Sequence, residues 1–313
     1  MTTSKSVSKS NTFSGTSRVD VYTRVTAKII ADLEAGIRPW LKPWSGEHAA
    51  GRITLPLRHC GTPYRGINIL LLWGEAMDKG YTASKWMTFK QAIELGGHVR
   101  KGEHGSLVVY ADRFTKTEAD ENGHDVEREI PFMKGYTVFN VEQIDGLPDT
   151  YTDKPAPKGE TMELIESAET FFAATGAIVR HGGNSAFYAP GPDVIQLPHP
   201  EAFRDAESYA ATKGHELVHW TKHKTRLDRD FGRKSFGDEG YAREELVAEL
   251  GAAFLCGTLG ITPEARADHA DYIGHWLKVL ADDKRAIFQA AAHAQRAVDF
   301  LHDLQGKRLE DAA

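Results

Sequence analysis

The sequence predicts an α+β protein of two domains, an N-terminal α+β domain and a C-terminal, mostly helical domain with a small antiparallel sheet. Three observations carry this prediction. Apolar residues recur with helical spacing in several segments, two stretches of the first half alternate as strands do, and residues 147–161 contain three prolines without apolar periodicity. We therefore expect a disordered tail at 1–17, a first domain at 18–146, a linker at 147–161 and a second domain at 162–313.

The first domain is expected to begin with three helices and to end with a β-hairpin. In residues 19–40, apolar side chains recur at every fourth position, which predicts an amphipathic helix. Residues 67–81 predict a second, buried helix, and residues 86–99 predict a third that ends at a Gly-Gly pair. Residues 106–116 and 129–144 alternate as strands on either side of a polar turn.

The second domain is expected to contain one helix, three short strands and then helices only. Gly, Asn and Pro separate the strands, and the segments after about Asp205 have helical spacing up to Leu304. The first helix is expected at 161–176, the strands at 177–183, 185–190 and 193–198, and the next two helices at 205–223 and 241–260.

Composition restricts the class of protein. The chain has 313 residues, of which 41% are hydrophobic and 26% charged, so both domains can bury a core. No apolar run approaches the roughly 18 residues of a membrane span, and the N-terminus lacks the apolar segment of a secretory signal. We therefore expect a cytoplasmic protein without a membrane partner, in which Cys60 and Cys256 stay reduced.

The net charge of −6 is unevenly distributed along the chain. Residues 52–104 carry eight basic and four acidic side chains, whereas the chain from residue 146 onward carries 19 basic and 27 acidic ones. A basic sector with aromatic residues, inside an otherwise acidic protein, indicates a polyanionic partner.

The segment KGHELVHW, residues 213–220, has the spacing of a helical metal site. His215 and His219 are four residues apart, so on a helix both imidazoles project from one face, as two ligands of a tetrahedral zinc must. Glu216 beside them is placed to take a proton from a metal-bound water and deliver it to a leaving amine. Because HExxH also arises by chance in a chain with 14 histidines, the prediction of a zinc peptidase depends on a third ligand.

We expect the third ligand on the following helix. Glu245 lies 26 residues after His219, on a helix whose apolar face can pack against the first. Glu249, one turn later, is expected to accept a hydrogen bond from the outer nitrogen of a metal-bound histidine, and it is also the alternative third ligand. Glu244 is rotated by about 100° and is predicted to be a solvated charge. His223 is disfavoured, because ligands on three successive turns of one helix cannot surround one ion.

Segments in both halves resemble one known family. HELVHWTKHKTRL and EELVAELGAAFL, preceded by YRGIN, SKWMTFKQA, GGHVRKGEHG and YTVFNVEQIDGL, are similar to the ArdC antirestriction proteins of conjugative plasmids and related mobile elements. The resemblance runs from about Val19 to Leu304. It implies an N-terminal domain that binds single-stranded DNA, a zincin-like metallopeptidase domain, and a protein that shields incoming plasmid DNA from host restriction.

Single-strand binding requires cationic side chains along the phosphates and aromatic faces against the bases. The segments PYRGINILLLW, SKWMTFKQ and RKGEHG interleave the two types. Trp73, within an apolar helix, is assigned to the core, and Phe89 fits either role. The candidate DNA contacts are Tyr64, Arg65, Asn68, Lys85, Trp86, Lys90, Arg100 and Lys101.

Together these observations predict a plasmid antirestriction protein that binds single-stranded DNA and carries a zinc-dependent HExxH peptidase domain. Manganese is the alternative ion, and host restriction or regulatory proteins are the candidate peptidase substrates. Two other hypotheses stay open at this point. One is a non-catalytic DNA-binding protein whose metal is structural, and the other is a cytosolic metalloprotease that cleaves a host regulator.

Overall fold

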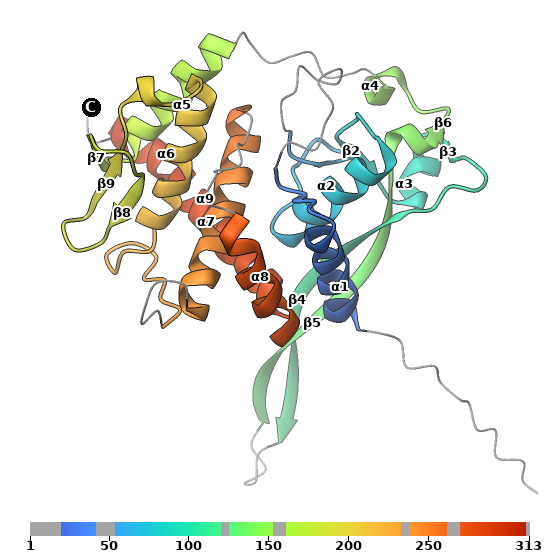
Figure 1. Cartoon of the computed structure of the whole chain (residues 1–313). Helices are drawn as coiled ribbons and strands as arrows, with labels where there is room; N and C mark the ends of the chain where they lie inside the picture. Colours follow the sequence, from blue (N-terminus) through green and yellow to red (C-terminus); the bar gives the residue numbers. More distant parts are fainter. Residues whose placement is uncertain are drawn as a thin grey trace, which may run out of the picture.

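The computed structural model describes most of the chain: residues 20–41, 54–119, 125–152, 161–232, 238–261 and 270–310. The predicted tail at 1–17 and the linker residues 153–160 lie outside these ranges, while the start of the predicted linker forms a short helix, α4 (Asp149–Thr152). Helices and strands are mixed as predicted for an α+β protein (Figure 1). Within the described ranges, no helix is both long and apolar enough to cross a membrane.

Two helices of the first half turn apolar faces to the interior. The side chain of Asp20 caps α1 (Val21–Glu34), whose valine, isoleucine and leucine at four-residue spacing are buried as predicted. The predicted buried helix is α2 (Ile67–Lys79), which is buried along most of its length. It ends at Gly80, whose φ of 71° favours a residue without a Cβ.

In the described residues of the first half there are six strands in two sheets. They are β1 (Leu57–Arg58), β2 (Lys85–Met87), β3 (His98–Val99), β4 (Ser106–Ala119), β5 (Asp125–Asn140) and β6 (Ile144–Asp145). Four of them form a sheet in the order β1-β2-β5-β4, and β3 pairs with β6 separately. β4 and β5 form the predicted hairpin, which extends away from the rest of the molecule in Figure 1.

The helix predicted over residues 86–99 is shorter than expected. The hydroxyl of Thr88 accepts a hydrogen bond from the backbone N–H of Gln91, and the Gln91 side chain accepts one from Thr88 N. This capping box starts α3 (Phe89–Glu94) after Thr88, and the two residues before Thr88 pair with β5 instead. The cap therefore outweighs the apolar spacing that placed the start of the predicted helix at Trp86. The helix ends just before the predicted Gly-Gly pair, where Gly96 has a φ of 83°.

The second half is mostly helical around a small sheet. Its elements are α5 (Thr161–Ala174), β7 (Ile178–His181), β8 (Phe187–Ala189), β9 (Val194–Leu197), α6 (Ala206–Trp220), α7 (Glu239–Leu259), α8 (Ala270–Asp282) and α9 (Ala286–Glu310). The strand order is β7-β9-β8, with β8 antiparallel and β7 parallel to β9. The prediction of an antiparallel sheet is therefore wrong in one respect, since the sheet is mixed. β9 runs antiparallel to β8 and lies between β8 and β7, to which it is parallel.

One hydrophobic core extends through both halves. Trp73 in α2 lies against Phe254 in α7, and Trp40 lies against Trp276 in α8, with ring centroids 6.1 Å apart in each pair. α1 and α8 lie side by side where the halves meet (Figure 1). The halves therefore share buried surface, and the exact limits of two domains stay a prediction.

Candidate functional site

Helices α6 and α7 approach each other closely and carry the candidate metal ligands. The side chains of Asp205 and Asp238 cap the first turns of α6 and α7. A Cβ added at Gly251 of α7 would lie 2.8 Å from both methyl groups of Val218 on α6, closer than real Cβ atoms come. The missing side chain therefore lets α7 bring a carboxylate to the imidazoles of α6.

Gly251→Ala is expected to destabilise the protein by about 1–3 kcal/mol, because the added methyl group must displace Val218 within a packed core. Denaturant unfolding measures the free energy of unfolding. Gly214→Ala on α6 is the matched control, since its Cβ would lie 3.5 Å from Leu255, an ordinary contact. The control should be neutral or stabilising by up to about 1 kcal/mol, because alanine favours helices over glycine. Equal stabilities of the two variants would contradict the close approach.

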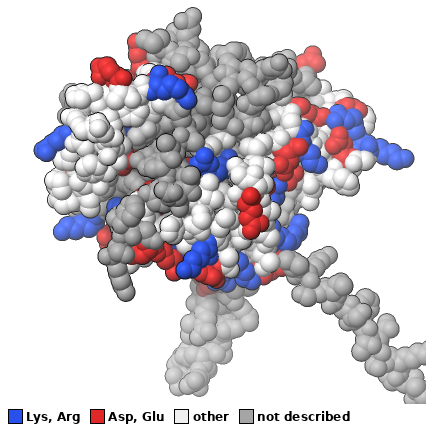
Figure 2. Space-filling view, viewed as in Figure 1, with Lys and Arg blue, Asp and Glu red and all other residues white. Residues whose placement is uncertain are grey.

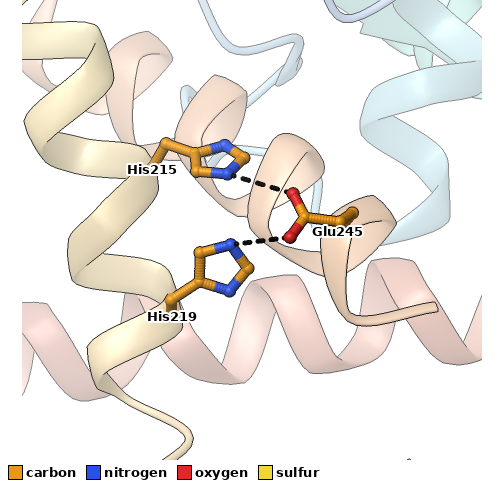
Figure 3. Close-up of side chains that lie close together, drawn as sticks. All are labelled: His215, His219 and Glu245. Carbon is orange, nitrogen blue, oxygen red and sulfur yellow. Dashed lines mark ion pairs between the residues drawn. The ribbon is translucent and has the colours of Figure 1, made fainter. Parts of the chain in front are cut away.

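Three side chains converge between the two helices (Figure 3). His215 Nε2 lies 3.6 Å from Glu245 Oε2, and His219 Nε2 lies 3.4 Å from Glu245 Oε1. One candidate ligand atom from each residue lies within 4.8 Å of the others. Two atoms that bind a tetrahedral metal at about 2.1 Å are about 3.4 Å apart, so these separations fit one divalent ion. In the part of the chain that is described, no second group of this kind occurs.

The three side chains are largely shielded from water. The exposed fraction is 3% for His215, 8% for His219 and 13% for Glu245. Burial opposes ionisation of Glu245, but the two imidazoles outweigh burial and hold the pKa of its carboxyl far below the usual range. Burial would lower the pKa of His219, yet the carboxylates of Glu245 and Glu244 raise it to about 9. A metal ion that binds to His219 therefore competes with a proton.

Glu216 and Glu249 lie on the same two helices. Glu216 follows His215 on α6 and is only 2% exposed. Glu249 Oε2 lies 3.8 Å from Nδ1 of His215, the nitrogen that does not pair with Glu245. The other oxygen of Glu249 accepts a hydrogen bond from Nε1 of Trp40 at 3.3 Å. Glu249 thus pairs with one imidazole and Glu245 with both, so the geometry favours Glu245 as the third ligand.

The prediction that Glu244 is a solvated charge is wrong. Its side chain is 8% exposed, and Oε1 lies 2.9 Å from Nδ1 of His219. Arg229 donates two hydrogen bonds to the same carboxylate, at 2.8 and 2.9 Å. Burial would raise the pKa of Glu244, but the hydrogen bonds from His219 and Arg229 lower it to about 2. Helical rotation correctly predicted that Glu244 and Glu245 point in different directions. No pattern in the sequence predicted the ion pair between Glu244 and Arg229 of the preceding loop.

His223 is not part of the cluster. α6 ends at Trp220, so His223 lies beyond the helix, and its Nδ1 is 2.8 Å from the hydroxyl of Thr225. His223 is therefore outside the group of candidate ligands, as expected, although it lies beyond the end of the helix and not on a third turn of it.

Three of the eight candidate DNA contacts have structural roles in the first half. Tyr64 and Trp86 are buried, with exposed fractions of 8% and 1%. Asn68 in α2 donates to the carbonyl oxygen of Val109 and accepts from its N–H, both at 2.8 Å, so it covers part of the edge strand β4. Contact of these three residues with DNA stays a prediction.

The other five candidates lie nearer the surface. Lys90 has 86% of its side chain exposed, and Lys101 is exposed as well. Several of the five have protein partners: Arg65 pairs with Asp299, Lys85 donates to Thr150 O, Arg100 pairs with Glu103 and Asp145, and Lys90 lies 3.6 Å from Glu94. Acidic and basic side chains are interspersed on the face shown in Figure 2.

Exposed aromatic side chains accompany these cations. Phe89 and Ile93, one turn apart on α3, are 54% and 56% exposed, and Phe139 lies against Phe89 at 6.3 Å between ring centroids. Tyr110 and Tyr136 form a second exposed pair on the hairpin, also at 6.3 Å. Neither tyrosine is among the predicted DNA contacts, although the alternation along β4 places Tyr110 on an outer face.

Two family models match the chain. The N-terminal domain of anti-restriction factor ArdC matches residues 19–139, and a zincin-like metallopeptidase matches residues 166–293. Uncharacterized protein y4eC of Sinorhizobium fredii (strain NBRC 101917 / NGR234) is 44% identical over 91% of this chain and 92% of its own length. A DNA primase TraC of Escherichia coli is 40% identical over 92% of this chain, which spans 27% of the primase.

The fold is similar to two crystal structures of the antirestriction ArdC protein from the R388 plasmid. The metal-free structure has a TM-score of 0.77 and 46% sequence identity, and the Mn(II)-bound structure has a TM-score of 0.74 and 44% identity. Each comparison covers 92% of this chain and 99% of the solved chain. Because sequence and structure agree over both halves, the chain belongs to the ArdC family of antirestriction proteins.

Proposed function

We propose that this protein binds single-stranded DNA through its first half, holds one divalent metal ion at His215, His219 and Glu245, and protects incoming conjugative DNA from host restriction. The observation that carries the metal site is the separation of 3.4 and 3.6 Å between Glu245 and the two imidazoles. The zincin-like match over residues 166–293 and the Mn(II)-bound structure of ArdC from R388 support a divalent ion in this fold.

Two imidazoles and one carboxylate are ligands that suit zinc, with manganese as the alternative. A zinc ion held there would lower the pKa of a bound water molecule to about 7 and would polarise a carbonyl group. Glu216, buried beside His215, is the proposed proton acceptor and donor for peptide hydrolysis. The low exposure of the cluster excludes bulk water and strengthens the electrostatic interactions within it.

Glu216→Gln is expected to keep the fold and the metal content but to lower peptide hydrolysis by about 100- to 10,000-fold, because the proton acceptor is lost. The measurement is metal-dependent cleavage of purified restriction subunits or host regulatory proteins, followed as fragments on a gel. Glu207→Gln, near the start of the same helix, is the matched control and should cleave like the wild type.

If Glu216→Gln cleaves as fast as the wild type, Glu216 is not the proton acceptor. A plasmid-transfer assay with the same variant adds a second result. Full protection of incoming DNA by a variant that no longer cleaves would mean that protection depends on DNA binding and not on hydrolysis.

The proposed DNA surface is centred on α3. Phe89 offers an exposed aromatic face, and Lys90 next to it offers an exposed charge. Arg100 and Lys101 follow in the exposed turn after β3. Aromatic faces for bases beside cations for phosphates are the combination that single-strand binding uses.

Phe89→Ala is expected to weaken single-stranded DNA binding by about 1–3 kcal/mol, the contribution of one stacked base. Lys90→Ala is expected to reduce the slope of log K against log salt by about 0.7, because one phosphate contact is lost. Fluorescence anisotropy of a labelled oligonucleotide at several salt concentrations measures both effects. Phe187→Ala, at 49% exposure, and Lys224→Ala are controls in the second half. If the controls weaken binding as much as the test variants, the surface on α3 is not the binding site.

A further inference from the structure

A buried arginine lies behind the proposed metal site. Arg229 belongs to a turn that folds back onto the end of α6, where its backbone N–H donates to Lys222 O at 3.0 Å. The side chain of Arg229 is only 1% exposed. Because a guanidinium remains charged when it is buried, this position requires a carboxylate and several further acceptors.

The donors of Arg229 are directed at one carboxylate and at the last turn of α6. Nε and Nη2 donate to Oε2 and Oε1 of Glu244 at 2.8 and 2.9 Å. Nη2 also donates to Val218 O at 3.0 Å, and Nη1 donates to Thr221 Oγ1 at 3.2 Å. Val218 and Thr221 lie on either side of His219 in the chain. Arg229 therefore fixes Glu244 relative to the helical turn that carries His219.

Glu244 transmits this constraint to His219. Oε1 of Glu244 lies 2.9 Å from Nδ1, while Nε2 of the same ring lies 3.4 Å from Glu245. Of the two neutral tautomers, a carboxylate at Nδ1 favours the one with its proton on Nδ1, which leaves the lone pair of Nε2 for a metal ion on the side of Glu245. The ring thus has one nitrogen for the carboxylate behind it and one for a metal ion.

We propose that Arg229 and Glu244 are positioning residues that hold His219 in the tautomer and orientation required to bind the metal ion. This inference rests on the metal site proposed above and adds two residues that act through His219 without touching the ion. Stability alone is a poor reason for the pair, because apolar residues of similar size often stabilise a core as well as a buried ion pair does.

The double variant Glu244→Leu with Arg229→Met removes both members of the buried ion pair. Lys222, whose Nζ lies 3.7 Å from Oε1 of Glu244, is 21% exposed and keeps its contact with water. Chelator competition with zinc alone, and with manganese alone, measures the metal affinity. We expect affinity to fall about 10- to 100-fold, while denaturant unfolding of the metal-free protein stays close to that of the wild type. A folded double variant with wild-type affinity overturns the positioning role and leaves the metal site intact. A wild-type protein that binds neither ion overturns both.

Arg226 and Asp193 provide a matched control. Arg226 donates two hydrogen bonds to Asp193 near the same end of α6, and Asp193 accepts a third from Tyr188 and not from a histidine of the site. Arg226→Met with Asp193→Asn should therefore change metal affinity by no more than about twofold. A loss equal to that of the first double variant would mean that any lost ion pair weakens the site, which contradicts a specific role for Glu244.

Nuclear magnetic resonance of the imidazole nitrogens tests the same proposal in the metal-loaded wild-type protein, with the double variant as its comparison. We expect the His219 proton on Nδ1, in a hydrogen bond that slows its exchange with water, and we expect that protection to disappear in the Glu244→Leu, Arg229→Met protein. A His219 proton on Nε2 overturns the proposal.

Discussion

Alanine in place of His215 or Glu245 is expected to lower metal affinity by at least about 100-fold, because even the hydrogen-bond partners of metal ligands contribute about 10- to 100-fold. Both residues contribute an atom to the single three-residue cluster found in the described chain. The measurement is the zinc and manganese content of dialysed protein, together with circular dichroism to show that each variant is folded.

Glu239→Ala, in the first turn of α7 with a side chain 66% exposed, is the control and should keep its metal. Glu249→Ala distinguishes the two candidates for the third ligand. Retention of metal in Glu245→Ala together with its loss in Glu249→Ala would reassign the ligand, although Glu249 lies 3.8 Å from only one imidazole.

Trp73→Ala is expected to reduce the free energy of unfolding by about 3–5 kcal/mol, the usual cost of truncating a buried aromatic side chain. Trp73 is 1% exposed, its Nε1 donates to Thr54 O at 2.9 Å, and its ring lies against Phe254 of α7. Because this contact joins the two halves, we expect both to unfold in one transition at a lower denaturant concentration.

Circular dichroism reports on the helices of both halves, and metal release reports on α6 and α7. Coincident transitions by the two methods support one cooperative unit. Two separate transitions, with the metal site surviving in Trp73→Ala, would instead mean that the halves fold independently. Phe187→Ala, which truncates an exposed aromatic ring, is the control and should change stability by no more than about 0.5 kcal/mol.

Local spacing predicted the parts of the fold that depend on near neighbours. The four-residue spacing of Val25, Ile29 and Leu33 predicted a buried helical face, and these three side chains are buried in α1. The same logic placed His215 and His219 on one face of α6, and the structure brings both to Glu245. In each case the relevant residues lie within one or two turns, so helical geometry alone relates them.

Contacts between distant segments could not be predicted in this way. Glu244 is buried because Arg229 from a loop neutralises it, and periodicity along α7 contains no information about that loop. Trp86 and Asn68 were proposed for DNA because they stand among cations in the sequence. In the structure Trp86 is buried and Asn68 is bonded to β4. Partners far along the chain decide such roles, and one sequence does not identify those partners.

Because the two halves share a hydrophobic core, we expect them to be inherited together. A recombination event that carried only the segment up to α4 would leave Trp40 and Trp73 facing water, and an apolar surface of that kind promotes aggregation. The match to the TraC primase covers 92% of this chain and 27% of the primase, so the primase contains a segment similar to both halves together. We therefore expect selection to act on the pair, because separation exposes apolar side chains of both halves to water.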